Sequence, residues 1–462
     1  MFEKNTGNPD WEITVCGSTW FMAFSEITTR KGRPEIPYRL NANNCVLFVD
    51  KPDLSWYNGK NLDYGVFMTD AQMNLTAALP DRPQKSERNM GVELFRVVSM
   101  MLVVMLHILG QGGVLSHTAY LSLNYKVAVF LQVITYCSVN CYAMISGYAN
   151  AKTEFKFRRF FFLWVETVFL LLLTTVLVHF FVPTVTVTRE WWLNAFFPLI
   201  RREYWYLCAY FFMFPLIPIM NKGLASLKRW QFILVIVSLQ MPTWFRLFTG
   251  ADNYVLGSGY STIWLICLYV IGAYFRFYGL PKWAKWYVTL PVFFLAAFIA
   301  WFRKLYPEMQ LAQGLITKDT EIYTRRGELI SYISPCMVVM AVMLLLLFMQ
   351  VKIKGKIPKL CVSYLGKATW GVFVIHVAAA FWYWRKFWGF FNHFGQYTTF
   401  KMVLAVLGAT VVVYLGLSLV SVFKILLFKY CRIDRGLSFL SDLPAKALSL
   451  LCGKRGKENP GT

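Results

Sequence analysis

The stretch Glu93-Leu-Phe-Arg-Val-Val-Ser-Met-Met-Leu-Val-Val-Met-Leu-His107 opens the first strongly apolar segment of the chain. Arg96 and His107 are eleven residues apart, and an α-helix turns about 100° per residue, so both lie on one face, about 16 Å apart along the axis. A guanidinium and an imidazole are costly in a hydrocarbon-spanning helix unless they face protein or trapped water. The pair therefore predicts a membrane helix that carries a functional site.

The composition predicts an all-α polytopic membrane protein. Of the 462 residues, 57% are hydrophobic and only 15% are charged, against about 25% charged residues in a soluble globular domain. Several windows of about 18 or more residues are nearly free of charge, which is the length that a membrane helix needs. The net charge of +23 lies mainly in short loops, where it favours cytoplasmic faces and anionic lipid headgroups and argues against nucleic-acid binding.

Two further classes of feature are not expected. The ten cysteines do not have the spacing of zinc ligands with histidine, so they are interpreted as packing residues and no metal site is predicted. Residues 1–15 lack the apolar core of a cleavable signal peptide.

About ten membrane helices are predicted from residue 92 onward. Basic residues such as Lys152, Lys228 and Lys356 gather in every second loop. Cytoplasmic loops carry the excess of Lys and Arg, so this alternation predicts an even number of spans, both termini in the cytoplasm, and a location in the cytoplasmic membrane of the cell. The predicted spans are residues 92–113, 125–147, 160–182, 203–221, 230–248, 259–278, 284–302, 329–351, 369–391 and 402–428.

The chain is predicted to have three regions: an amino-terminal cytoplasmic extension at 1–88, a ten-helix domain at 89–430 and a basic cytoplasmic tail at 431–462. The extension carries ten Lys/Arg and eleven Asp/Glu, and its run Cys45–Asp50 is typical of a strand. A small folded appendage, a poorly ordered tail, and translated sequence upstream of the true start are all open interpretations of the extension.

Two segments are predicted to lie at the outer face of the membrane. Residues 189–198 are too short to span it and rich in aromatic side chains, so they are expected at the headgroup level. The loop 303–328 is long enough to form a lid or a contact surface.

Arg96 and His107 suit complementary chemical roles. Burial disfavours the charged imidazole, and a neutral histidine within reach of a hydroxyl serves as a general base. Arg96 keeps its charge and suits a phosphate or carboxylate near the inner interface. The alternative is a structural ion pair and a histidine that only packs between helices.

Six short motifs follow one another in register with the predicted helices. They are Arg96-(ten residues)-His107, Asn140-Cys-Tyr-Ala-Met-Ile-Ser-Gly-Tyr148, Lys156-Phe-Arg158-Arg159 with Leu163-Trp164, Tyr204-Trp-Tyr-Leu-Cys-Ala-Tyr210 with Pro215, Pro218 and Asn221, Gly259-Tyr-Ser-Thr-Ile-Trp264 with Gly272-Ala-Tyr, and Leu365-Gly-Lys-Ala-Thr-Trp-Gly-Val-Phe-Val-Ile-His376. Over about residues 90–430 the series resembles the acyltransferase-3 family of bacterial membrane acyltransferases, which modify cell-envelope and exported polysaccharides.

The resemblance implies a reaction and roles for several residues. In that family a multi-pass domain takes an acyl group, most often acetyl, from acyl-coenzyme A on the cytoplasmic side and delivers it to a hydroxyl of an exported or lipid-linked glycan. By resemblance, His107 is the catalytic base and Arg96 its companion at the donor site. The other residues implied at the acyl-coenzyme A site are Lys156, Arg158, Arg159, Ser146 and Tyr148. A positive-inside loop explains the three basic residues equally well, and close helix packing explains Ser146 and its neighbour Gly147.

Aromatic and histidine side chains are candidates for binding the acceptor glycan. Trp205, Tyr206 and Trp264 are expected to stack on sugar rings, although packing between helices is a competing explanation for each. His376 is given a site role by the resemblance, and a hydrogen bond between helices is equally open for it.

Glu166 is a further candidate, because it follows Arg159 by seven residues and so lies on nearly the same helix face. The expectation is that it neutralises Arg159 or Arg96, or orients His107. A purely structural pair is the alternative.

Two other classes of protein compete with the enzyme. In a polytopic transporter or flippase for glycans, Arg96, His107, Glu166 and His376 would form a polar path, but the internal repeat that favours such a protein is not visible in the sequence. A non-catalytic membrane component of a polysaccharide assembly complex is the third possibility.

Overall fold

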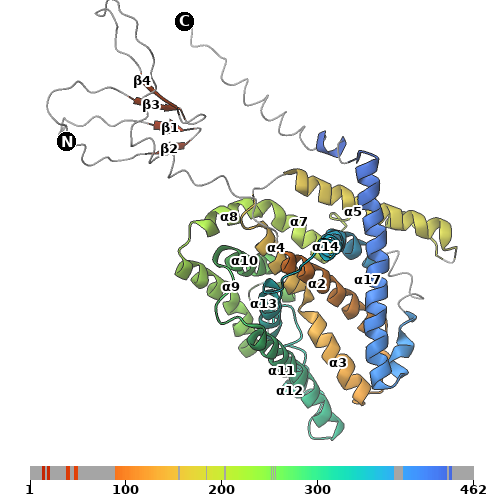
Figure 1. Ribbon diagram of the computed structural model, residues 1–462. Coiled ribbons are helices and arrows are strands. Elements are labelled where there is room, and N and C mark those ends of the chain that lie inside the picture. Colours follow the sequence, from red (N-terminus) through yellow and green to blue (C-terminus); the bar gives the residue numbers. More distant parts are fainter. Residues whose placement is uncertain are drawn as a thin grey trace, which may run out of the picture. The chain divides into compact units, whose positions relative to one another are not determined.

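A computed structural model divides the chain into two units, Met1–Ser86 and Glu87–Thr462 (Figure 1). It describes four short strands of the first unit and, in the second, residues 89–439 except 154–156, 184, 202–203, 251, 253, 255, 379–388 and 434–435. The predicted tail from residue 440 onward lies outside the described residues. The roles expected of the extension and the tail stay predictions.

The first unit contains two antiparallel strand pairs. β1 (Ile13–Val15) pairs with β2 (Ser18–Trp20), and β3 (Tyr38–Asn41) pairs with β4 (Val46–Val49). The sequence of β4 is Val-Leu-Phe-Val, composed mainly of residues that favour strands. The strand predicted within Cys45–Asp50 is therefore present.

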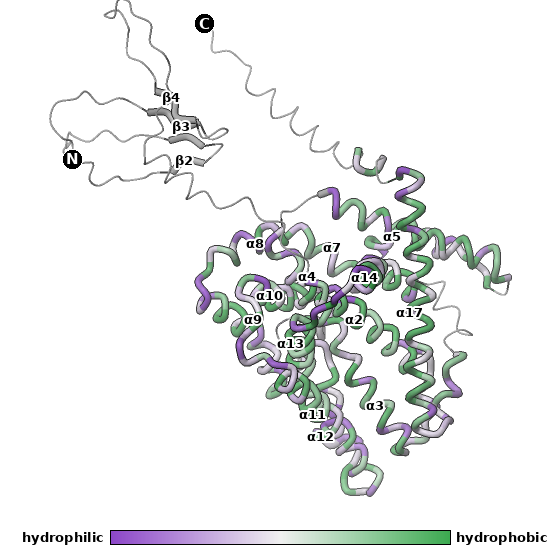
Figure 2. The backbone as a smooth tube through the Cα atoms, in the orientation of Figure 1, coloured by the Kyte–Doolittle hydropathy of each residue, from purple (hydrophilic) through white to green (hydrophobic). Residues whose placement is uncertain are grey.

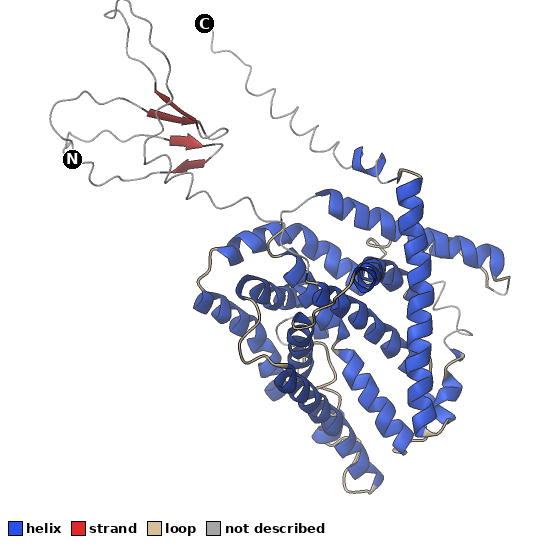
Figure 3. Ribbon diagram, in the orientation of Figure 1, coloured by secondary structure: helices blue, strands red, loops and turns tan. Residues whose placement is uncertain are grey.

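The described part of the second unit is built from helices (Figure 3). Its longer helices are α2 (Met90–Leu109), α3 (Leu123–Tyr136), α4 (Ser138–Asn150), α5 (Phe157–Phe181), α7 (Trp205–Met213), α8 (Ile217–Ala225), α9 (Arg229–Thr249), α10 (Thr262–Tyr278), α11 (Trp286–Ala312), α13 (Pro335–Met349), α14 (Lys356–His376) and α17 (Thr399–Tyr430). The short ones are η1 (Leu115–His117), α6 (Arg189–Phe196), η2 (Phe214–Leu216), η3 (Gly257–Gly259), α12 (Glu321–Thr324) and η4 (Asn392–Gln396).

Among the described residues, seven helical stretches are long and apolar enough to cross a membrane. Figure 2 shows that hydrophobic residues dominate most of these helices. α10 and α13 are apolar but shorter, with 17 and 15 residues. The all-α polytopic membrane fold is confirmed, while the number of ten spans stays a prediction. The seven stretches are Met90–Leu109, Leu123–Asn150, Arg158–Phe181, Trp205–Ala225, Arg229–Thr249, Trp286–Ala312 and Thr399–Tyr430.

The bounds predicted for the ninth span were wrong. The prediction placed it at 369–391, but α14 begins at Lys356 and ends at His376. Lys356 and Lys359, predicted in a loop, are exposed residues of the first helical turns. Lysine is a good helix former, so charge alone does not mark the end of a helix. Residues 379–388 of the predicted span lie outside the described residues.

Helix α2 lies at the centre of the larger unit, between α9 on one side and α17 on the other in Figure 1. It packs against α3, α4, α13, α14 and α17. Two apolar clusters meet along it, because Phe95 belongs to one cluster and Met100, Val104 and Ile108 belong to the other. A helix enclosed in this way directs its polar side chains toward protein.

Close packing joins α4 to α10 through two glycines. A Cβ atom at Gly147 would overlap the carbonyl oxygen of Tyr269, and one at Gly272 would overlap that of Met144. Only glycine lets two helix backbones approach so closely. The predicted packing alternative thus holds for Gly147, the neighbour of Ser146.

Three helices begin beside the middle of the stretch formed by α3 and α4. The Tyr136 ring contacts the Tyr332 ring, 5.1 Å between centroids, just before α13 begins. Asn140 accepts a hydrogen bond from the indole of Trp264 near the start of α10, and the Tyr142 ring contacts that of Tyr206 near the start of α7. The starts of α7 and α10 and the residues just before α13 therefore lie against the same α3–α4 stretch.

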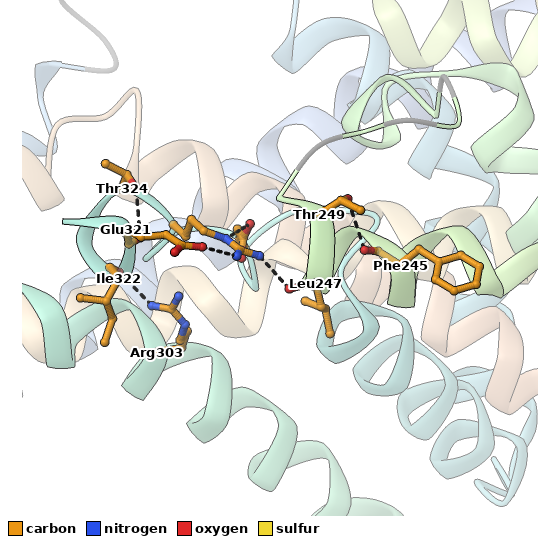
Figure 4. A network of polar contacts seen from close by, with 9 residues as sticks. Phe245, Leu247, Thr249, Arg303, Glu321, Ile322 and Thr324 are labelled. Atoms are coloured by element: carbon orange, nitrogen blue, oxygen red, sulfur yellow. Dashed lines mark hydrogen bonds and ion pairs between the residues drawn. The ribbon is translucent and has the colours of Figure 1, made fainter. Parts of the chain in front are cut away.

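The two segments predicted at the outer face both contain helix. Residues 189–196 form α6, whose position relative to a membrane stays a prediction. α11 continues ten residues beyond its predicted end, to Ala312. The rest of the loop is tied down: Arg303 donates to the carbonyl of Ile322, and Arg325 donates to Glu321, to Glu328 and to the carbonyl of Leu247 (Figure 4).

Candidate functional site

Local sequence fixes the start of α2 and therefore the positions of Arg96 and His107. The Asn89 side-chain oxygen caps the helix, accepting from the backbone N–H groups of Gly91 at 2.9 Å and Val92 at 3.3 Å. Glu93 lies in the first turn, where its negative charge interacts favourably with the positive end of the helix dipole. From this start an unbroken helix reaches Leu109, so the one-face relation expected of Arg96 and His107 holds.

The structure brings His107 against His376, a residue 269 positions later. Their ring centroids are 4.9 Å apart and the ring planes meet at 64°. His376 is fully buried and His107 is half-buried. Because His107 contacts a buried side chain of α14, its ring faces protein and not lipid.

One nitrogen of His376 is fixed and the other lacks a partner. Nδ1 lies 3.0 Å from the carbonyl oxygen of Val372, one turn earlier in α14. A carbonyl can only accept, so we assign the proton to Nδ1, which leaves a lone pair on Nε2. Nε2 is buried and has no hydrogen-bond partner within the described part of the chain. A buried acceptor without a donor costs about 1–3 kcal/mol, so His376 offers this acceptor to an incoming donor group.

Arg96 is held by Glu93, a residue whose role the sequence analysis missed. Its Nη1 donates to Glu93 Oε2 at 2.6 Å, and its side chain remains 21% exposed. Glu93 in turn lies against Gly366 of α14, where a Cβ atom would be 2.9 Å from Oε2. The backbone carbonyl of Arg96 accepts from the Tyr142 hydroxyl at 3.1 Å. The spacing of three residues between Glu93 and Arg96 was the signal that could have identified this pair.

Glu166 has a cation partner that the sequence did not predict. Its carboxylate forms an ion pair with Lys424 of α17 and so takes the structural alternative. Lys424 is buried among apolar helices, where a cation needs a counter-charge. Helical spacing relates residues of one helix only, so it could not reveal a partner on α17.

The described residues that were predicted at the donor site have different environments. Lys156 lies outside the described residues. Arg158 and Arg159 are exposed, and the Arg158 guanidinium lies 5.2 Å from the centre of the Phe162 ring. Ser146 and Tyr148 are buried in α4. The Ser146 hydroxyl donates to the Tyr210 hydroxyl at 3.4 Å, while the Tyr148 ring lies under the guanidinium of Arg276 at 5.3 Å.

The three aromatic residues predicted to bind sugar have different environments. Trp264 is fully buried, and its indole N–H donates to Asn140 at 3.1 Å. It belongs to the core, so the prediction that it stacks on a sugar was wrong. Tyr206 is buried between other rings, whereas Trp205 remains half-buried.

A series of ring contacts connects Trp205 to the histidines. Successive centroids are 5.5 Å apart from Trp205 to Tyr206, 5.5 Å from Tyr206 to Phe373 and 5.8 Å from Phe373 to His376. Phe373 was not singled out from the sequence, although it lies in the same motif as His376. Trp205 is therefore at one end of this series of rings, and the histidine pair is at the other.

The arrangement suits proton transfer at one end of α2 and anion binding at the other. A half-buried imidazole and a buried lone pair lie together near its end, and a guanidinium lies near its start. Among the described residues, no three His, Cys, Asp or Glu side chains lie close enough together to hold a metal ion.

Comparison with known proteins identifies the family. No curated protein and no solved structure matches the chain. The profile described as "Acyltransferase domain" matches residues 89–421, which is most of the chain and includes α2 and the histidine pair. The match shows that this membrane protein belongs to the acyltransferase-3 family.

Proposed function

We propose that the protein is a bacterial O-acyltransferase of the polysaccharide-modifying type. It moves an acyl group, most simply acetyl, from acyl-coenzyme A to a hydroxyl of a cell-envelope or exported polysaccharide or its lipid-linked precursor. The contact between His107 and His376 supports the proposal most strongly. His107 lies on α2, the helix that also carries Arg96.

His107 is the proposed base. It takes the proton of the acceptor hydroxyl as the oxygen attacks the thioester carbonyl, a role worth about 10²–10⁴ in rate. The new carbon–oxygen bond forms while the carbon–sulfur bond breaks, and the proton passes to the departing thiolate of coenzyme A. His376 accepts a hydrogen bond at Nε2 from a second, neighbouring hydroxyl of the acceptor. This bond positions the attacking hydroxyl against His107 and supplies the donor that the buried nitrogen lacks.

Arg96 is the proposed donor-site cation. Its side chain keeps part of its surface exposed while Glu93 holds one of its nitrogens. A guanidinium has five N–H donors, so others remain to meet a phosphate or the thioester oxygen. Lys156, Arg158, Arg159, Ser146 and Tyr148 stay proposed contacts of acyl-coenzyme A. Arg158 and Arg159 fit the role only as exposed charges that attract its phosphates.

The proposal places the protein in the cytoplasmic membrane with both termini in the cytoplasm. Acyl-coenzyme A is cytosolic, so the Arg96 end of α2 faces inward and the His107 end lies deeper in the membrane. The alternation of basic loops supports this orientation. Acyl-coenzyme A and the glycan acceptor are then the partners, together with membrane lipids.

The test uses purified protein with radiolabelled acetyl-coenzyme A and a cell-envelope glycan fraction as acceptor. Wild type is expected to label the glycan, and His107→Ala is expected to lose that label. His393→Ala is the matched control, since that ring contacts Phe390, Phe394 and Tyr397 away from the pair. Full acetyl transfer by His107→Ala would show that His107 is not the base. No acetyl transfer by folded wild type would favour the glycan transporter.

A further inference from the structure

Four aromatic residues gather where α7, α10 and α13 begin: Trp205, Tyr260, Tyr332 and Tyr136, here called the aromatic platform. Trp205 stacks on Tyr332 at 5.7 Å between centroids and meets Tyr260 edge-on at 4.6 Å. Tyr332 also contacts Tyr136 and Tyr260, each at 5.1 Å. Tyr260 stays 49% exposed and Trp205 half-buried, so the platform retains free aromatic surface.

The polar groups of the platform are neutral hydroxyls. The Tyr260 hydroxyl interacts with those of Tyr136 and Tyr332. Both oxygens of the nearby Asp252 carboxylate accept from backbone N–H groups, of Leu256 and Ser258. Arg246 donates to Ser331 through Nη1, and its buried Nε lacks a hydrogen-bond partner among the described residues. Aromatic faces together with neutral hydroxyls suit a ligand that is apolar on one side and hydroxylated on the other.

The loop that carries Tyr260 is held in an unusual conformation. Gly257, Ser258 and Gly259 all have positive φ, of 60°, 53° and 96°. A Cβ atom at Gly259 would overlap that of Tyr332, so only glycine lets the loop lie on this ring. Ser258 is a non-glycine residue in the left-handed region, which costs about 1–3 kcal/mol and persists only where surrounding structure enforces it. Asp252 supplies that restraint, and the result is that Tyr260 lies against Trp205.

We propose that the aromatic platform binds a neutral pyranose ring of the acceptor glycan, with Trp205 and Tyr260 stacking on the sugar and the tyrosine hydroxyls bonding to its hydroxyls. This inference rests on the proposed function. The ring contacts from Trp205 through Tyr206 and Phe373 to His376 make the platform continuous with the histidine pair. A neighbouring sugar of the same glycan then presents its hydroxyl to His107. A lipid tail would contact the ring faces alone, whereas a sugar also exchanges hydrogen bonds with the tyrosine hydroxyls.

Binding is tested without acyl donor, by saturation-transfer NMR on the full chain in detergent. The probes are the methyl glycosides of glucose, galactose and N-acetylglucosamine, with hexanol as the apolar probe. Saturation is expected on the ring protons of at least one glycoside. Tyr260→Ala is expected to weaken that binding about tenfold, the factor that about 1.4 kcal/mol corresponds to, and Trp205→Ala at least as much. Tyr260→Phe keeps the ring and is expected to retain most of the affinity.

Tyr254→Ala is the matched control, because Tyr254 precedes the same loop and is 50% exposed but stacks on Phe245. The inference is overturned if no glycoside binds folded wild type, if Tyr254→Ala weakens binding as much as Tyr260→Ala, or if hexanol displaces the glycosides completely. Glycoside binding by a wild type that transfers no acetyl group would refute the proposed function alone. Acetyl transfer with an unchanged acceptor KM in Tyr260→Ala would refute the platform alone.

Discussion

Two buried polar regions of the larger unit differ in whether their groups have partners. Glu308, only 2% exposed at the end of α11, accepts from the Tyr125 hydroxyl at 2.9 Å, from Lys304 at 2.8 Å and from Arg326 at 3.3 Å. His376 is equally buried, yet its Nε2 has no partner in the part of the chain that the structure describes. A complete network stabilises the fold by itself, whereas an unpartnered buried acceptor is stabilised by any donor that reaches it, from water or from a ligand. The comparison therefore assigns stability to Glu308 and chemistry to the histidines.

Replacing His107 is expected to have the largest effect. His107→Gln keeps a polar side chain but removes the base, so acetyl transfer should fall about 10²–10⁴-fold. Thermal unfolding in detergent should change little, because the side chain is only half-buried. Steady-state transfer of radiolabelled acetyl groups measures the first quantity. Equal losses of transfer and stability would mean that His107 is structural, as Glu308 is.

Glu308→Gln reverses that pattern. It leaves Lys304 and Arg326 without their carboxylate, but these side chains are 20% and 30% exposed, so water compensates in part. The free energy of unfolding is expected to fall by about 1.5–3 kcal/mol, the range for hydrogen bonds to charged groups. Chemical unfolding in detergent gives this value. Transfer per folded molecule should stay at the wild-type level, and a tenfold loss would contradict the division between the two regions.

Sequence reasoning reached the individual elements and failed where two distant segments meet. Arg96 and His107 follow from one helical period, so their shared face could be predicted. The contact of His107 with α14 could not be predicted, because the register of α14 on α2 depends on packing such as that of Gly366 against Glu93. The ion pair between Glu166 and Lys424 could not be predicted for the same reason.

Composition also gave incomplete guidance about aromatic residues. Trp264 and Trp205 look equivalent in a chain with seventeen tryptophans, yet Asn140 binds the indole of Trp264 in the core. Tyr260 and Tyr332 were not singled out as site residues, because their meeting depends on the left-handed loop at Gly259. A Gly-x-Gly-Tyr sequence indicates a turn, but it does not indicate which ring the turn approaches.

His376→Phe tests the incomplete region directly. Phenylalanine fills a similar volume and removes the unpartnered Nε2, which by itself costs about 1–3 kcal/mol, although the bond from Nδ1 to Val372 is lost as well. The melting temperature should therefore not fall, while acetyl transfer should drop about tenfold, equivalent to about 1.4 kcal/mol, through loss of hydroxyl positioning. A rise in acceptor KM at unchanged donor KM would identify that cause. A large drop in melting temperature would show that Nε2 of His376 already has a hydrogen-bond partner in the folded protein.

The smallest expected effect comes from removing one of the three donors to Glu308. Tyr125→Phe deletes the hydroxyl that reaches Oε2 but leaves Lys304 and Arg326 on Oε1. Because Tyr125 is only half-buried, water can replace the hydroxyl, and the free energy of unfolding should fall by about 1 kcal/mol with no change in transfer. Chemical unfolding alongside Tyr120→Phe, an exposed neighbour in ring contact at 5.4 Å, separates loss of the hydrogen bond from general loosening of α3. If Tyr125→Phe lowered the free energy of unfolding as much as Glu308→Gln does, the three donors would act as one unit. The region would then need all three hydrogen bonds to be stable.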